Sequence, residues 1–159
     1  MGYSEMKVRD IMHQGVMTVE ATAALQQVTS FFIEHGITGA PVVGPNGAPV
    51  GVISMSDLTA HAAGLDKPKE GAFLRELWSD DSHASLRDLT FDTAATAGDV
   101  MTEFLIRIDA DAEVRELLEL MKTARLHRVF VTDKDKLVGI VTTLDLVVLL
   151  DRLLAERSA

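Results

Sequence analysis

Two short motifs place a hydroxyl and a carboxylate where a predicted strand gives way to a predicted helix. They read SMSD from Ser54 to Asp57 and TTLD from Thr142 to Asp145, and each follows a glycine and two aliphatic residues. A hydroxyl residue followed three positions later by an acid is typical of a helix capping box. The same helix N-terminus offers free backbone N–H groups, and an aspartate there can accept two hydrogen bonds from a diol. The motifs therefore fit helix capping, binding of a ribose-like ligand, or both.

A basic pair, His127 and Arg128, stands directly before a predicted strand in the second half of the chain. Arginine offers two parallel donors to a phosphate, and histidine can add a third. By itself such a pair is equally compatible with a solvated surface, but the expected proximity of Asp145 favours an anion site. The aligned residues of the first half, Thr38 and Gly39, carry no charge. We therefore expect two related sites of unequal chemistry.

One pattern occurs twice, over residues 8–64 and again over residues 97–154. Asp10-Ile11-Met12 returns as Asp99-Val100-Met101, and the Gly51-Val52-Ile53-Ser54 run returns as Gly139-Ile140-Val141-Thr142. Each copy predicts the order β-α-β-β-α. The expected strands are residues 16–19, 39–43 and 48–53, then 105–108, 128–132 and 136–141. The first helix of each copy is expected to begin near Thr22 or after Asp111, and the second helices span 55–63 and 143–156.

A single copy is too small to cover its own sheet, so the two copies are expected to pack through their sheets about a pseudo-two-fold axis. The fold class is α+β. The domain boundaries follow as repeat 1 over residues 1–64, a helical linker over residues 65–96, and repeat 2 over residues 97–159. The linker is expected to contain an amphipathic helix with Phe73, Leu74, Leu77 and Trp78.

Composition excludes several classes of function. The net charge of −9 argues against a nucleic-acid partner, and the absence of cysteine excludes disulfides, thiolate metal sites and cysteine nucleophiles. The five histidines lack metal-ligand spacing, and no nucleophile elbow or phosphate-loop motif is present. We expect no catalytic residues, no metal, no membrane span and a cytoplasmic location.

The last predicted helix is apolar around most of its circumference from Leu146 to Leu154. Such a helix must be covered either by its own chain or by another subunit. We favour a homodimer contact over a purely internal role.

Together, the two copies, the Asp-h-Met openings (h, aliphatic), the Gly-h-h-Ser/Thr-x-x-Asp closures and the His-Arg strand resemble a tandem pair of cystathionine-β-synthase (CBS) domains. Such a pair is also called a Bateman module, here of the stand-alone bacterial type. The resemblance implies a non-catalytic regulatory module that needs no cofactor. It implies binding of AMP, ADP or ATP, or of S-adenosylmethionine, in clefts between the repeats, and a signal to a separate target protein. The alternative outside this class is a ligand-independent dimeric interaction module.

The resemblance also assigns residues to two clefts. In the main cleft it implies that Asp145 holds the ribose, Thr142 the ribose or phosphate, and His127 and Arg128 the phosphates. Thr143 is a further residue of the main cleft. The residues that would wall the base are Ile140, Val16, Met17 and Thr18. The second, weaker cleft would use Asp57, Ser54, Val52, Thr38, Gly39, Ile106 and Arg107. It departs from the family pattern at Thr38 and Gly39, where Arg107 could partly compensate.

Overall fold

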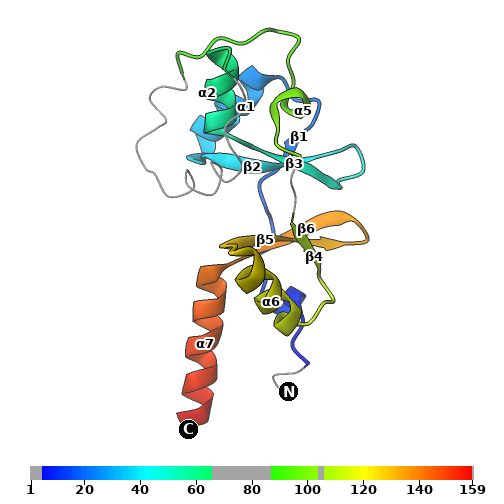
Figure 1. The fold of residues 1–159 in the computed structure, drawn as a ribbon, viewed down its shortest axis with the longest axis vertical. Coiled ribbons are helices and arrows are strands. Elements are labelled where there is room, and N and C mark those ends of the chain that lie inside the picture. Colours follow the sequence, from blue (N-terminus) through cyan, green and yellow to red (C-terminus); the bar gives the residue numbers. More distant parts are fainter. Residues whose placement is uncertain (1–4, 66–86, 104–105, 159) are drawn as a thin grey trace. The chain divides into compact units, whose positions relative to one another are not determined.

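The computed structural model describes residues 5–65, 87–103 and 106–158 and divides into two compact units (Figure 1). The first-repeat unit comprises residues 17–105, and the second-repeat unit comprises residues 1–16 together with residues 106–159. The predicted linker helix with Phe73 and Trp78 lies outside the described residues. The described end of the linker contributes Leu89 and Phe91 to the apolar core of the first-repeat unit.

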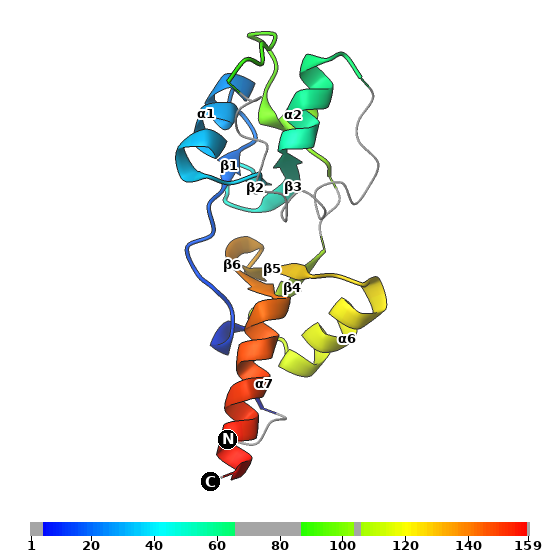
Figure 2. The ribbon, with the colours of Figure 1, turned by 90° about the vertical axis from the view of Figure 1, so that its left-hand side faces the viewer.

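The first-repeat unit is a three-stranded sheet with two helices on one face (Figures 1 and 2). Its elements are β1 (Val19–Glu20), α1 (Leu25–His35), β2 (Gly39–Val43), β3 (Pro49–Ser54), α2 (Met55–Ala62) and the short α5 (Ala97–Val100). Strand β2 lies in the middle, parallel to β1 and antiparallel to β3. Phe32, Leu58 and Ile53 are fully buried between the helices and the sheet. The apolar stripe of each helix therefore covers one face of the sheet.

The second-repeat unit has the same topology. Its elements are the 3₁₀ turn η1 (Val8–Asp10), β4 (Arg107–Asp109), α6 (Val114–Ala124), β5 (Arg128–Asp133), β6 (Lys136–Thr142) and α7 (Thr143–Ser158). Strand β5 is parallel to β4 and antiparallel to β6. The apolar core of this unit includes Leu117, Val129 and Val141. The predicted α+β class and the β-α-β-β-α order of both repeats are confirmed.

The predicted starts of the first helices and first strands are wrong by a few residues. Helices α1 and α6 begin at Leu25 and Val114, and the backbone N–H groups before them bond the side chains of Gln27 and Glu116. Asp111 is not the helix cap, since Glu113 directly precedes α6, and the Asp111 carboxylate accepts a 2.7 Å bond from Arg9. Strands β1 and β4 begin about two to three residues later than predicted, because backbone pairing with β2 and β5 begins only there.

The opening segment of each repeat packs in the unit of the other repeat. We name residues 5–13 the N-terminal strap and residues 94–102 the internal strap. In the N-terminal strap, the N–H groups of Val8 and Arg9 donate to the carbonyls of Ala112 and Ala110 at 3.0 and 2.9 Å. In the internal strap, the N–H groups of Ala97 and Gly98 donate to Ala23 and Ala21, both at 2.8 Å. The sequence repeats and the compact units are therefore different divisions of the chain.

The aspartate of each Asp-h-Met opening closes a turn within its own strap. The Asp10 carboxylate accepts a 2.9 Å bond from the Lys7 N–H. The Asp99 carboxylate accepts bonds from the Thr96 N–H and hydroxyl, both at 2.9 Å. These bonds lower the pKa of Asp99, with the backbone bond as the larger cause.

The methionine of each opening lies directly over a sheet glycine. A Cβ added to Gly139 would meet the Met12 sulfur at 2.6 Å and the His13 carbonyl oxygen at 2.8 Å. A Cβ added to Gly51 would meet the Met101 sulfur at 2.6 Å and the Thr102 carbonyl oxygen at 2.7 Å. The side chains could shift, but the carbonyls are fixed by backbone bonds to the adjacent strand residue. The paired motifs in the sequence are thus the two halves of one contact.

We expect Gly139→Ala and Gly51→Ala each to lower the free energy of unfolding by about 1–3 kcal/mol, because the added methyl group overpacks this contact. Urea denaturation measures the loss. Gly44→Ala is the matched control, since its nearest contact would be an ordinary 3.5 Å from the Val50 side chain. Equal losses in all three variants would contradict this account.

Candidate functional site

The candidate site of the second-repeat unit lies where β6 ends and α7 begins. One oxygen of Asp145, Oδ2, accepts hydrogen bonds from the Thr142 N–H at 2.6 Å and the Thr142 hydroxyl at 2.8 Å. These bonds make Asp145 part of the N-terminal cap of α7, as the motif predicts. The other oxygen, Oδ1, contacts His13 Nε2 of the N-terminal strap at 2.5 Å. Capping therefore leaves one carboxylate oxygen facing outward, and a histidine lies against it.

The basic pair lies beside this helix start. Arg128 is the direct cross-strand neighbour of Thr142, which places both side chains on one face of the sheet. The His127 carbonyl accepts bonds from the Thr143 N–H at 3.0 Å and its hydroxyl at 3.3 Å. These bonds hold the start of β5 against the first turn of α7, while the His127 side chain is exposed.

Arg128 is half-buried, and burial lowers the pKa of its guanidinium. Within the described part of the chain, its guanidinium has no carboxylate partner. A desolvated cation without a counter-ion is a favourable place for an anion to bind. The sequence-predicted anion site thus has an available donor.

An apolar strip continues from Arg128 along the same face of the sheet. Phe130 lies opposite Ile140 on one side and opposite Arg107 on the other, so the three side chains share the face. This face points away from α6, since the alternating residues Val129 and Val141 are fully buried in the core. The Arg107 guanidinium bonds Asp135 at 3.1 Å. Both Arg107 and Ile106 therefore belong to the unit that holds Asp145, whereas the resemblance groups them with Asp57.

The equivalent site of the first-repeat unit has the same helix cap but lacks the basic residues. Oδ2 of Asp57 accepts bonds from the Ser54 N–H at 2.8 Å and the Ser54 hydroxyl at 2.9 Å, and both residues are buried. Gly39 is the cross-strand neighbour of Ser54, and the Thr38 carbonyl accepts a 2.9 Å bond from the Met55 N–H. The basic pair has no counterpart here.

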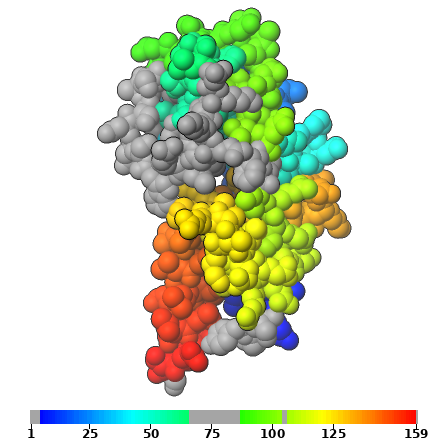
Figure 3. All heavy atoms as spheres, in the orientation of Figure 1, coloured from blue at the N-terminus to red at the C-terminus, as the bar shows by residue number. Residues whose placement is uncertain are grey.

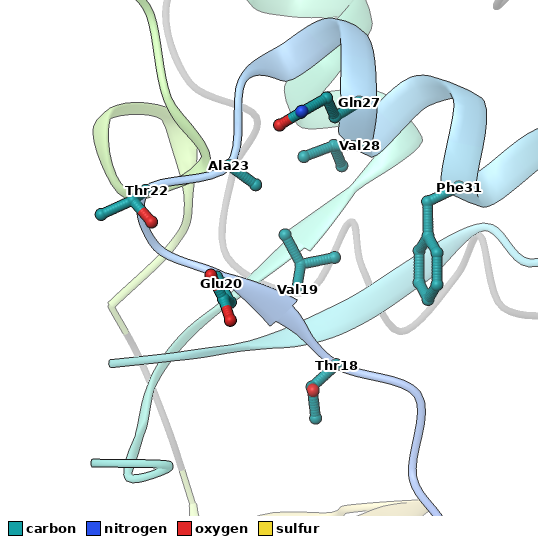
Figure 4. Close-up of a pocket in the computed structure, with 8 residues that line it drawn as sticks. All are labelled: Thr18, Val19, Glu20, Thr22, Ala23, Gln27, Val28 and Phe31. Carbon is teal, nitrogen blue, oxygen red and sulfur yellow. The ribbon is translucent and has the colours of Figure 1, made fainter. Parts of the chain in front are cut away.

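The four residues expected to wall the base are divided between the units, with Ile140 on β6 of the second-repeat unit. Val16 belongs to the second-repeat unit, and Met17 and Thr18 belong to the first-repeat unit just before β1. The Met17 side chain is exposed. Thr18 lines a pocket of about 300 Å³ between β1 and α1, together with Glu20, Gln27 and other residues (Figure 4). Except for Thr18, this pocket contains none of the residues predicted to bind ligand.

Two features of the site escaped the sequence reasoning. His13 is, from the sequence, only one of five histidines without metal-ligand spacing, yet it contacts Asp145, because the N-terminal strap pairs with β6 through Ile140. Phe130 is predicted as a strand residue without a role, although its register places it between Arg107 and Ile140. Side chains alternate between the two faces along any strand, which could have indicated the side of Phe130, but no local signal indicates the His13 contact.

The described residues contain no group of three or more His, Cys, Asp or Glu side chains that could hold a metal ion. Among the helices of the described segments, none is both long and apolar enough to cross a membrane.

Comparison with known proteins gives the family. The model of the CBS domain matches residues 8–64 and 97–152. Among curated proteins, the chain is 29% identical over 140 residues to hypoxic response protein 1 of Mycobacterium tuberculosis, covering 87% of this chain and 80% of the relative.

Two solved structures share the fold. The crystal structure of CBSX2 in complex with AMP is 24% identical, with a TM-score of 0.63 and coverage of 92% of this chain and 97% of that one. The CBS domain pair of protein MJ0100 in complex with 5′-methylthioadenosine and S-adenosyl-L-methionine is 22% identical, with a TM-score of 0.57 and coverage of 92% and 96%. With two matched repeats, each folded as β-α-β-β-α, this chain belongs to the CBS domain family.

Proposed function

We propose that the chain is a non-catalytic regulatory module that binds an adenine nucleotide of the AMP, ADP or ATP class at the α7 N-terminus. The observation that carries the proposal is the half-buried Arg128, which lies beside the Thr142–Asp145 cap and has no carboxylate partner among the described residues. CBS domain pairs are regulatory modules, and related pairs are solved with AMP or with S-adenosylmethionine and 5′-methylthioadenosine. The nucleotide's binding free energy would shift a conformational equilibrium that a separate protein senses. The cytoplasmic location stays a prediction.

Each part of a nucleotide has a matching group near the α7 N-terminus. Asp145 presents an acceptor for ribose hydroxyls, and Arg128 and His127 present donors for phosphate oxygens. The Phe130–Ile140 strip supplies an apolar surface on the same face of the sheet. Val16 belongs to the same unit, and Met17 and Thr18 are assigned to the base by family resemblance alone.

Arg128 favours an adenosine ligand that carries phosphate over one that carries a sulfur group at the same position. S-Adenosylmethionine carries one carboxylate and 5′-methylthioadenosine carries no anionic group, so neither brings the phosphate oxygens that a guanidinium pairs with most strongly. S-Adenosylmethionine is therefore the second choice of ligand. The Asp57 site lacks a basic residue at Thr38 and Gly39, so we rank it as the weaker site.

A specific observation favours a second function, a ligand-independent dimeric interaction module. Helix α7, orange to red in Figure 3, has no buried residue. Several of its large apolar side chains are exposed. The exposed ones are Leu144, Val147, Val148, Leu150 and Leu154, each more than half exposed. A second copy of α7 is the occupant we propose, because a two-fold contact matches an apolar surface with itself. Dimerisation and nucleotide binding are compatible.

We expect AMP, ADP or ATP at about 100 times its dissociation constant to stabilise the protein by roughly 2.7 kcal/mol in a thermal-shift screen. GTP and S-adenosylmethionine are the comparison ligands.

Asp145→Asn, which keeps an oxygen for the α7 cap, should weaken binding of the active nucleotide by roughly tenfold or more, since a charge-assisted hydrogen bond contributes about 1.5–3 kcal/mol.

The matched control is Asp57→Asn, which makes the same change in the equivalent cap of the first-repeat unit. We expect it to change affinity much less. Equal losses in the two variants would overturn the ranking of the sites. A folded, unliganded protein that no nucleotide stabilises would leave the interaction module as the function.

We expect the wild-type protein to sediment as a dimer in analytical ultracentrifugation and Val148→Lys to sediment as a monomer, because a charge would be buried in the apolar contact. Glu156→Lys makes a charge change of similar kind on the same helix outside the apolar surface and should leave the dimer intact. A monomeric wild type, or a dimeric Val148→Lys, would exclude α7 as the contact.

A further inference from the structure

The contact between His13 and Asp145 joins the N-terminal strap to the predicted ribose site. His13 comes from the segment that opens the chain, and Asp145 lies in the first turn of the last helix. The backbone of His13 is fixed independently of its side chain. Its N–H donates to the Ile140 carbonyl at 2.9 Å, and its carbonyl accepts from the Ile140 N–H at 3.0 Å. The imidazole can therefore move while the strap stays in place.

The hydrogen-bonding capacity of Asp145 is nearly used up. A carboxylate has about four acceptor positions, two on each oxygen. The Thr142 N–H and hydroxyl occupy the two on Oδ2, and His13 Nε2 occupies one of the two on Oδ1. A ribose diol needs two acceptor positions on the carboxylate. Only one is left while His13 stays in contact.

We propose that His13 is a latch on Asp145 that a ligand with a ribose diol must displace, so that the N-terminal strap sets the affinity of the site. This inference rests on the proposed nucleotide binding and names its regulation. The His13 side chain is 69% exposed, whereas the Asp145 side chain is 10% exposed. Because the imidazole is mostly in water, it can swing outward without uncovering apolar surface, and only the ion pair or hydrogen bond is lost.

The internal strap has a different residue at the equivalent position. Thr102 exchanges backbone bonds with Val52 at 2.8 and 2.9 Å, as His13 does with Ile140. The strap backbone therefore accepts threonine at this position with the same pairing. The long, planar donor that reaches the aspartate is particular to the N-terminal strap.

The test is titration calorimetry of the full chain with AMP and with 2′,3′-dideoxy-AMP, which lacks the diol. We expect His13→Thr to bind AMP about two- to fivefold more tightly than wild type, the range that loss of an exposed ion pair gives. Affinity for the dideoxy analogue should stay unchanged, because it does not compete for Asp145. Thr102→Ala is the matched control on the other strap and should leave both affinities unchanged. His13→Ala repeats the test in case His13→Thr is poorly folded.

The outcomes separate the latch from the proposed function. Tighter binding of AMP alone supports the latch. Unchanged or weaker AMP binding by a folded His13 variant overturns the latch and leaves nucleotide binding intact. An equal gain for AMP and the dideoxy analogue also overturns it, since the gain would not depend on the diol. If neither the wild type nor the variants bind AMP, the proposed function and the latch fail together.

Discussion

The approach of a strap backbone to a sheet glycine is the constraint on which both units depend. Met12 and Met101 lie over Gly139 and Gly51 at a distance that leaves no room for a side chain on the glycine. Next to each glycine, a pair of backbone bonds joins the strap to the last strand of the sheet. That strand runs directly into the helix whose first turn carries the Asp57 or Asp145 motif. The strap contact therefore fixes the strand from which the candidate site begins.

This dependence explains why the Asp-h-Met and Gly-h-h-Ser/Thr-x-x-Asp motifs occur together. The aspartate of the opening closes the strap turn, the methionine covers the glycine, and the later aspartate caps the helix that follows. In each motif the aspartate forms hydrogen bonds with residues close to it in the sequence. The methionine or glycine of the motif instead contacts a residue far away in the sequence. The polar part is readable from spacing alone. The distant part becomes clear only when the strap is placed against its sheet.

The sequence was sufficient for the order of the strands, because apolar runs and the turns after Val43 and Asp133 mark the two hairpins. It was sufficient for the caps at Ser54 and Thr142 as well. It could not give the partner of each strap, since both copies carry the same opening and both offer the same glycine. The His13 contact depends on that choice of partner and was missed for this reason. Asp111, the expected cap of α6, instead bonds Arg9 of the N-terminal strap, another contact between distant segments.

The helix caps at Asp57 and Asp145 share one motif but differ in burial and in the residues around them. Asp57 and Ser54 are buried, beside uncharged Thr38 and Gly39, and their strap contributes Thr102. Asp145 keeps some exposure, lies on the sheet face that carries Arg128, and receives His13 from its strap. A helix cap needs only the carboxylate oxygen that bonds the backbone, so it places no demand on the second oxygen. That second oxygen is where the repeats can differ without loss of the fold, and in this chain it is the Asp145 oxygen that contacts His13 of the N-terminal strap.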